Sequence, residues 1–193
     1  MSDLPLRTCT AFQGDTRIAG GPLAEVALAV KVALEAEPGA SVLVFDDETG
    51  RVIDFDLRGT AEEIAARLDA PAAAAPAERG RGRPKLGVVA REVTLLPRHW
   101  DWLAQQPGGA SQALRRLVEE ARRSDGGRSR ARRSQETAYA FISAMAGDRA
   151  GFEEASRALF AGDAAGFATH SRSWPADIRA HAEKLAADAL HAG

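Results

Sequence analysis

Apolar positions in the first 70 residues follow two different spacings, and each spacing predicts a different kind of element. Alternation of apolar and polar residues is typical of strands that bury one face, whereas apolar residues three and four apart are typical of helices. The alternating stretches are 7–12, 16–19, 41–45 and 51–57, and the helical ones are 22–34 and 60–68. The predicted order in this segment is therefore ββαββα.

Turn and cap residues lie between these stretches. Gly14-Asp15 predicts a hairpin between the first two strands, and the run Asp46 to Gly50 predicts a second hairpin between the last two. Thr60 is followed three positions later by Glu63, which is the spacing of a capping box at the start of a helix. The first 70 residues thus read as a small α+β unit.

The middle of the chain has a different pattern. Residues 89–96 alternate as a strand, Pro97 ends that strand and opens a short helix, and 107–109 (PGG) stop this helix. Ser111 is placed to cap a second helix. Apolar residues recur at helical spacing within that second helix; they are Leu114, Leu117, Val118 and Ala121. A strand followed by two helices is predicted.

The last 60 residues predict a helical bundle. The expected helices are 134–146, 151–160, 164–172 and 175–191. A near-repeat, AGDRAGF and AGDAAGF, places Asp148 and Asp163 where each would cap a helix. The expected core is aromatic and consists of Phe141, Phe152, Phe160, Phe167 and Trp174. His170, His181 and His191 share no metal-ligand spacing and are interpreted as incidental.

Charge is segregated along the chain in a way that the net charge of −2 conceals. Residues 79–133 contain 14 of the 25 Lys and Arg but only five of the 27 acidic residues. A basic centre between acidic flanks favours an anionic partner, and nucleic acid is the first candidate. The expected divisions are an acidic α+β domain (1–70), a linker that is Ala/Pro-rich and then basic (71–85), a dimerisation and DNA-binding segment (86–123), a basic linker (124–133) and a helical domain (134–193).

The basic run RGRGRPK resembles the AT-hook, whose core is Arg-Gly-Arg-Pro. The matching residues and their basic flanks are Arg79, Arg81, Gly82, Arg83, Pro84 and Lys85. In this motif glycine lets the backbone approach the floor of a narrow A·T minor groove, and arginines enter its negative potential. A generic solvated basic linker is the alternative reading.

Residues 86–123 resemble the ribbon-helix-helix fold of the MetJ/Arc/CopG superfamily. The resemblance rests on Leu96-Pro97 at the strand-helix junction and on GASQALRRLV (109–118) at the start of the second helix. It implies an obligate homodimer whose paired strands enter the major groove of DNA. The implied dimer core is Val93, Leu95, Trp100, Leu103, Leu114 and Leu117. Backbone N–H groups from Gly109 to Ser111 would hold a phosphate, and Arg115 and Arg116 would add contacts to DNA.

The strand register leaves one question open. If Val93 and Leu95 face the core, Glu92 and Thr94 face the groove. Glu92 could accept a hydrogen bond from a cytosine amino group, or the fold could serve dimerisation without base reading. Both readings remain open from the sequence.

The common motifs for catalysis and cofactor binding are absent from the sequence. The chain contains no phosphate-binding loop, dinucleotide-binding turn, nucleophile elbow or paired Cys/His ligands, and its single cysteine excludes an intramolecular disulfide. We therefore expect no enzyme activity, cofactor or metal. We also expect a cytoplasmic protein, since no leader or membrane-spanning stretch is present.

The sequence thus predicts a dimeric DNA-binding protein, either a transcriptional regulator or a nucleoid-type protein. The first alternative is a protein interaction module that dimerises without reading DNA. The weaker alternative is a ligand sensor or enzyme of unknown class with a pocket between the terminal units. As a whole the chain resembles an uncharacterised bacterial family defined only as a domain of unknown function, and this resemblance implies no activity.

Overall fold

The predicted Gly14-Asp15 hairpin joins the first two strands of a small antiparallel sheet. The computed structural model describes residues 7–69 and 91–191. Strand β1 (Thr8–Gln13) pairs with β2 (Thr16–Pro22) on one side and with β3 (Val42–Asp46) on the other, in the order β2-β1-β3. In the described part of the chain these are the three strands, and eight helices accompany them.

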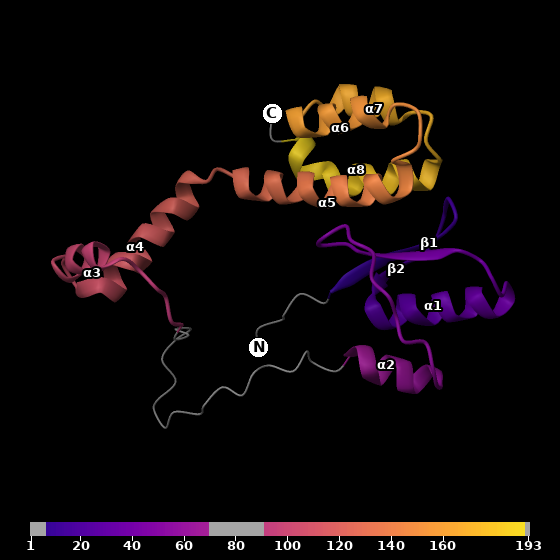
Figure 1. Ribbon diagram of the computed structural model, residues 1–193, viewed down its shortest axis with the longest axis horizontal. Helices are drawn as coiled ribbons and strands as arrows, with labels where there is room; N and C mark the ends of the chain where they lie inside the picture. Colours follow the sequence, from indigo (N-terminus) through magenta and orange to yellow (C-terminus); the bar gives the residue numbers. More distant parts are fainter. Residues whose placement is uncertain (1–6, 70–90, 192–193) are drawn as a thin grey trace. The chain divides into compact units, whose positions relative to one another are not determined.

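The sheet buries both of its faces, because alternate residues of its strands enter two different hydrophobic clusters. Cys9, Ala11 and Val44 pack against helix α1 (Leu23–Ala36), which covers one face. Phe12 and Phe45 point to the opposite face, where they join the residues of C-terminal helices. Helix α2 (Ala61–Asp69) lies beyond α1 (Figure 1).

The expected fourth strand does not join the sheet. Main-chain hydrogen bonds run from Asp46 N–H to Arg51 O and from Ile53 N–H to Val44 O, and then the ladder ends. The predicted alternation is nevertheless present, since Ile53, Phe55 and Leu57 pack against the α1 cluster while Asp54 and Asp56 are exposed. Burial of one face therefore holds this segment without further sheet pairing.

The capping box at the start of α2 is confirmed. The Thr60 N–H donates to Glu63 Oε2 over 2.8 Å, and the Glu63 N–H donates to Thr60 Oγ1 over 3.3 Å. Two amide groups at the helix start are thereby satisfied by side chains.

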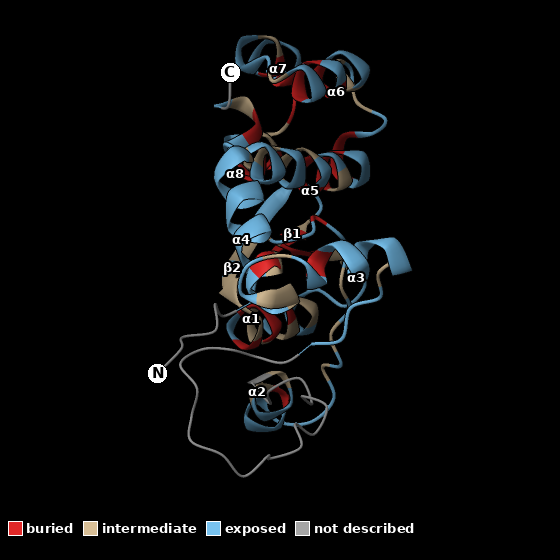
Figure 2. Cartoon of the chain, turned by 90° about the vertical axis from the view of Figure 1, so that its left-hand side faces the viewer, coloured by how far each residue is buried: buried red, intermediate tan, exposed pale blue. Residues whose placement is uncertain are grey.

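Four helices follow in the C-terminal part: α5 (Arg128–Ala146), α6 (Phe152–Ala161), α7 (Ala164–Ser171) and α8 (Ala176–Leu190). Helices α5 and α8 pack side by side over the Phe12 face of the sheet, and α6 and α7 form the outer layer (Figure 1). Buried residues concentrate on the sides where these layers meet (Figure 2).

The C-terminal helices differ from the sequence prediction in three details. Helix α5 begins at Arg128, so most of the expected basic linker 124–133 is helical; the break falls at Gly127, whose φ is 87°. Gly151 rather than Asp148 precedes α6, although Asp163 caps α7 as predicted by accepting from the Gly166 N–H. Phe160 is 52% exposed and lies outside the expected aromatic core, because the buried face of α6 is formed by Ala155, Ser156, Ala158 and Leu159.

The central helices form a separate pair. Helix α3 (Pro97–Ala104) begins at Pro97 as predicted, and α4 (Gly109–Ser124) packs against it. Contacts divide the chain into a terminal unit, made of Met1–Ala73 and Gly127–Gly193, and a central unit, Ala74–Gly126. The segments 1–70 and 134–193, which we expected to form two domains, thus share one unit and one hydrophobic core around Phe12, Phe45 and Phe141.

Candidate functional site

Helix α4 of the central unit has two faces of opposite character. Ala113, Leu114, Leu117 and Val118 recur at spacings of three and four and therefore share one side of the helix. The opposite side is rich in arginine: Arg115, Arg116, Arg122 and Arg123. Glu119 and Glu120 are interspersed there, and Glu119 forms an ion pair with Arg122 at 3.2 Å. The helix thus presents an apolar face and a mixed face with excess positive charge.

The apolar face of α4 is only partly covered within the chain. It contributes to a groove of about 280 Å³ lined by Leu95, His99, Trp102, Leu103, Leu114 and Leu117. Leu103 is buried, but Trp102 is 48% exposed and Val118 is 55% exposed. An apolar groove that leaves large apolar side chains exposed is typical of an interaction surface.

The groove brings together four of the six residues predicted for a dimer core: Leu95, Leu103, Leu114 and Leu117. Val93 and Trp100 do not line it and are 53% and 40% exposed. Trp100 is exposed in the single chain because α3 turns His99 and Leu103 toward α4, and its place in a dimer core stays a prediction. The four-residue spacing of His99 and Leu103 was the sequence signal for that face.

The described part of the predicted strand, residues 91–96, has no β pairing within the chain. Its last residue, Leu96, is extended, with φ −66° and ψ 150°. A strand is defined by hydrogen bonds to a neighbour, and the resemblance places that neighbour in a second copy. The strand therefore stays a prediction. Glu92 and Thr94, which the predicted register directs toward DNA, are both exposed.

The start of α4 differs from the prediction in two ways. Gly108, with φ 80°, precedes the helix, and Ser111 lies within its first turn instead of capping it. The Ser111 Oγ accepts a hydrogen bond from Arg115 Nη2 over 3.0 Å. The Gly109 N–H already donates to Gln106 O over 3.0 Å, so it is not available to a phosphate.

The AT-hook-like residues Arg79, Arg81, Gly82, Arg83, Pro84 and Lys85 lie outside the described residues.

The terminal unit contains a polar cluster at the end of β3. Asp46 accepts hydrogen bonds from the Arg7 guanidinium at 2.6 Å and from the main-chain N–H groups of Glu48 and Thr49. Burial acts to raise the pKa of Asp46, but these donors outweigh it and the pKa is lowered. The neighbouring Asp47 accepts from Thr10 Oγ1 at 2.8 Å and from Lys184 Nζ at 3.2 Å. Asp46 thus orders the turn, while Asp47 connects it to α8.

His181 of α8 is buried beside this cluster, and sequence reasoning missed it. Its ring lies against Phe12 and Phe141, with centroids 5.6 and 4.7 Å away. Neither ring nitrogen has a hydrogen-bond partner among the described residues, and Nε2 is 3.7 Å from Asp47 Oδ1. Burial lowers the pKa of His181 to about 4, against the opposing effect of Asp47. The available signal was its position three residues after Ile178 and four before Leu185, on the buried face of α8.

The described residues contain no group of three or more His, Cys, Asp or Glu side chains arranged to hold a metal ion. Within the same ranges, no helix combines the length and apolar character needed to cross a bilayer. Among the features described above, the α3–α4 surface and the polar cluster of the terminal unit combine exposed or unpartnered groups with a defined geometry.

These features define an α+β protein in which a small antiparallel sheet lies between helical layers. A two-helix unit is inserted in the sequence between the two segments that form the terminal unit. The family model described as an uncharacterised protein conserved in bacteria (DUF2239) matches residues 8–186, and the chain belongs to that family. No curated protein and no solved structure matched the chain.

Proposed function

We propose that the protein is a dimeric DNA-binding protein, a transcriptional regulator or a nucleoid-type protein, whose central unit both joins two copies and contacts the duplex. The observation that carries this proposal is the division of helix α4 into an apolar face and an arginine-rich face. One helix presents an exposed apolar side next to a groove and, on its other side, four arginines.

The apolar side supports self-association. Leu117 and Val118 remain exposed after α3 has packed on α4, and residues 91–96 have no β partner in the described part of the chain. A second copy supplies both missing surfaces at once, as the ribbon-helix-helix resemblance implies. Val93 and Trp100, which are exposed in the single chain, would then enter the dimer core.

The charge distribution supports DNA as the partner. The segment 79–133 holds more than half of the chain's basic residues, whereas the rest of the chain is net acidic. Arg115 and Arg116 would contact phosphates, with Thr94 and Glu92 directed toward the groove and the 79–85 segment placed in the minor groove. The acidic terminal unit would face away from the duplex, since like charges repel.

Fluorescence anisotropy of the full chain on AT-rich and GC-rich duplexes across a salt series tests this proposal. We expect binding below about 1 μM near physiological salt. Arg115→Ala/Arg116→Ala should reduce the slope of log K on log salt by about 2, since each phosphate contact contributes about 0.9. The matched control is Arg157→Ala/Arg172→Ala, which removes the same charge from the exposed surface of the terminal unit. A further variant, Arg81→Ala/Arg83→Ala, should remove any AT preference.

If the α4 variant and the control lose DNA affinity and salt dependence equally, α4 is excluded as the DNA-contacting element. Absence of binding to every duplex would favour the second candidate, a protein interaction module. The exposed groove favours that candidate specifically, because its apolar lining serves association whether or not DNA is bound.

A further inference from the structure

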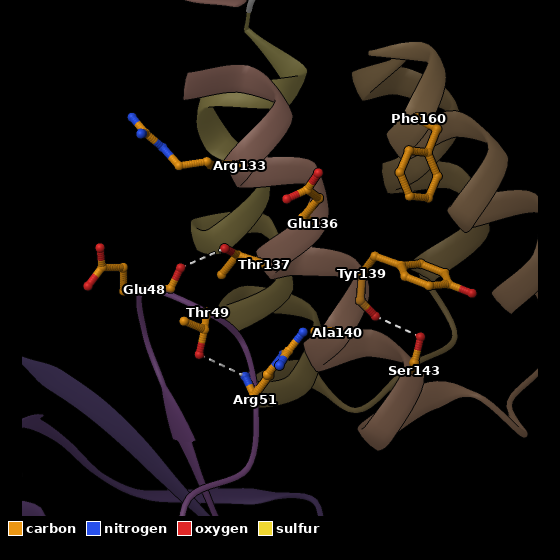
Figure 3. A pocket seen from close by; sticks show the side chains of 10 residues that line it. All are labelled: Glu48, Thr49, Arg51, Arg133, Glu136, Thr137, Tyr139, Ala140, Ser143 and Phe160. Atoms are coloured by element: carbon orange, nitrogen blue, oxygen red, sulfur yellow. Dashed lines mark hydrogen bonds between the residues drawn. The ribbon is translucent and has the colours of Figure 1, made fainter. Parts of the chain in front are cut away.

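A hollow of about 630 Å³ lies in the terminal unit, between the turn that follows β3 and helices α5 and α6 (Figure 3). Its volume is within the range of small-molecule sites, about 300–1,000 Å³. The hydroxyl of Thr137 donates to Glu48 O over 2.8 Å and holds the turn against α5 at the hollow's floor. The hollow is thus formed by two segments that are far apart in the sequence.

One wall of the hollow is aromatic. Tyr139 of α5 and Phe160 of α6 have ring centroids 5.3 Å apart, and Figure 3 shows both rings on the same side of the hollow. Tyr139 is 41% exposed and Phe160 is 52% exposed. They are the large aromatic side chains that the described part of the terminal unit leaves exposed, and the two are adjacent. The two ring planes are inclined at 59°, so a flat ligand would stack on one ring and meet the other at an angle.

The hollow is also lined by an arginine that has no ion pair among the described residues. Arg51 extends from the turn toward α5 (Figure 3), and no carboxylate of the described residues pairs with it. Some other arginines of the terminal unit have acidic partners, as in the pairs Arg7–Asp46, Arg58–Asp56, Arg130–Asp188 and Arg149–Asp15. Arg133, the second arginine that lines the hollow, resembles Arg51 in having no carboxylate at ion-pair distance among the described residues. Glu136, which also lines the hollow, already pairs with Arg132 at 3.2 Å. The Arg51 guanidinium is therefore available to an anion.

The remaining charged groups of the hollow lie apart from the rings. Arg133 and Glu48 point to the side away from Tyr139 and Phe160 (Figure 3). They have opposite charges, so together they add little net charge. Arg51 is therefore the positive group of the hollow that we assign to an anion beside the aromatic wall.

We propose that this hollow binds a small planar aromatic anion, with its ring against Tyr139 and Phe160 and its carboxylate or phosphate on Arg51. Arginine is suited to this role because its planar guanidinium binds an oxyanion through two parallel N–H groups. A small anion fits better than a nucleic acid strand, since the terminal unit carries more acidic than basic residues and would repel a polyanion. The proposal is independent of DNA binding by the central unit.

The test uses the full chain and three probes: 1-naphthoate, its neutral analogue 1-naphthamide, and the non-aromatic anion cyclohexanecarboxylate. Saturation-transfer NMR detects contact, and calorimetric titration measures affinity. We expect 1-naphthoate to bind with a dissociation constant on the order of 1 mM or tighter, and both analogues to bind about tenfold more weakly. The comparison between probes requires no variant and so cannot fail through misfolding.

Variants then locate the site. Arg51→Gln should weaken 1-naphthoate about tenfold and leave the affinity for 1-naphthamide unchanged, because only the charge-dependent contact is lost. Tyr139→Ser/Phe160→Ser should weaken both aromatic probes. The control Arg172→Gln removes an exposed charge outside the hollow and should change neither affinity.

Three outcomes would overturn the proposal. They are no saturation transfer from 1-naphthoate up to about 10 mM, equal affinity for the acid and the amide, and equal behaviour of Arg51→Gln and Arg172→Gln. The last outcome would place naphthoate elsewhere, with the apolar α3–α4 groove as the alternative location.

Discussion

The side-chain hydroxyl of Thr137 donates a hydrogen bond of 2.8 Å to the main-chain carbonyl of Glu48, and the two residues are 89 positions apart. This bond fastens α5 to the turn that follows β3, and Gly50 of the same turn lies directly against the Thr137 backbone. The N-terminal sheet and the C-terminal helices are therefore joined by a specific polar contact as well as by their shared core.

Thr137→Val should destabilise the chain by about 1 kcal/mol, because valine retains the shape of threonine but cannot donate to Glu48 O. Thr137→Ser keeps the hydroxyl and should retain the hydrogen bond while losing one methyl contact. Urea unfolding followed by circular dichroism would measure both. A valine variant as stable as the parent would show that the contact contributes nothing to stability.

Gly50→Ala should destabilise the chain strongly. Gly50 has φ +67°, and an added Cβ would overlap the carbonyl of Thr137. The control is Gly14→Ala, where φ is +56° but no atom lies within 4 Å of the added Cβ.

The control isolates the cost of the backbone conformation, about 1–2 kcal/mol. The clash at Gly50 should add at least about 2 kcal/mol to that cost. Equal unfolding midpoints for the two alanine variants would contradict the close approach of the turn and α5.

His181 makes the stability of the chain depend on pH. Its pKa in the folded protein is about 4, below the ordinary value of 6.5, so its neutral form is favoured by folding. His181 therefore makes its full contribution to the free energy of unfolding above pH 6.5. This contribution is lost as the pH drops from 6.5 through 4, and the loss amounts to up to about 3 kcal/mol. Asp47, Lys184 and Arg17 are the charged groups that act on it.

Unfolding free energies measured from pH 7 to pH 4 for the parent, His181→Leu and His170→Leu would test this dependence. His181→Leu should flatten the profile between pH 6.5 and pH 4, whereas His170→Leu changes an exposed residue of α7 and should leave the profile as in the parent. An unaltered slope in His181→Leu would assign the pH dependence to other groups.

Leu117→Asp should convert the proposed dimer to monomer. Leu117 is 39% exposed in the single chain, so a charge there is compatible with a folded monomer but not with a buried interface. Val32→Asp, on the exposed side of α1, is the control because Val32 is 65% exposed. Sedimentation at several concentrations should show a mass change in the first variant alone. The same dimer mass in both variants would exclude the α4 face as the interface.

Local sequence patterns were sufficient to predict most of the elements. The Gly14-Asp15 turn, the Thr60-Glu63 capping box, the start of α3 at Pro97 and the Asp163 cap of α7 all follow from residues within a few positions of one another. Such features depend on backbone preferences and short-range hydrogen bonds, which neighbouring residues determine. The DNA-binding residues predicted from the same patterns remain a proposal.

Tertiary structure decided which elements meet. Phe12, Phe141 and His181 lie far apart in the sequence and form one buried group, and the hollow beside Arg51 exists because α5 packs on the turn after β3. Residues 51–57 keep the alternation of a strand without its ladder, because strand pairing depends on a neighbour that no local pattern specifies. The sequence by itself determined the kinds of element and their order along the chain. Only long-range burial of apolar surface decided that its two ends share one core.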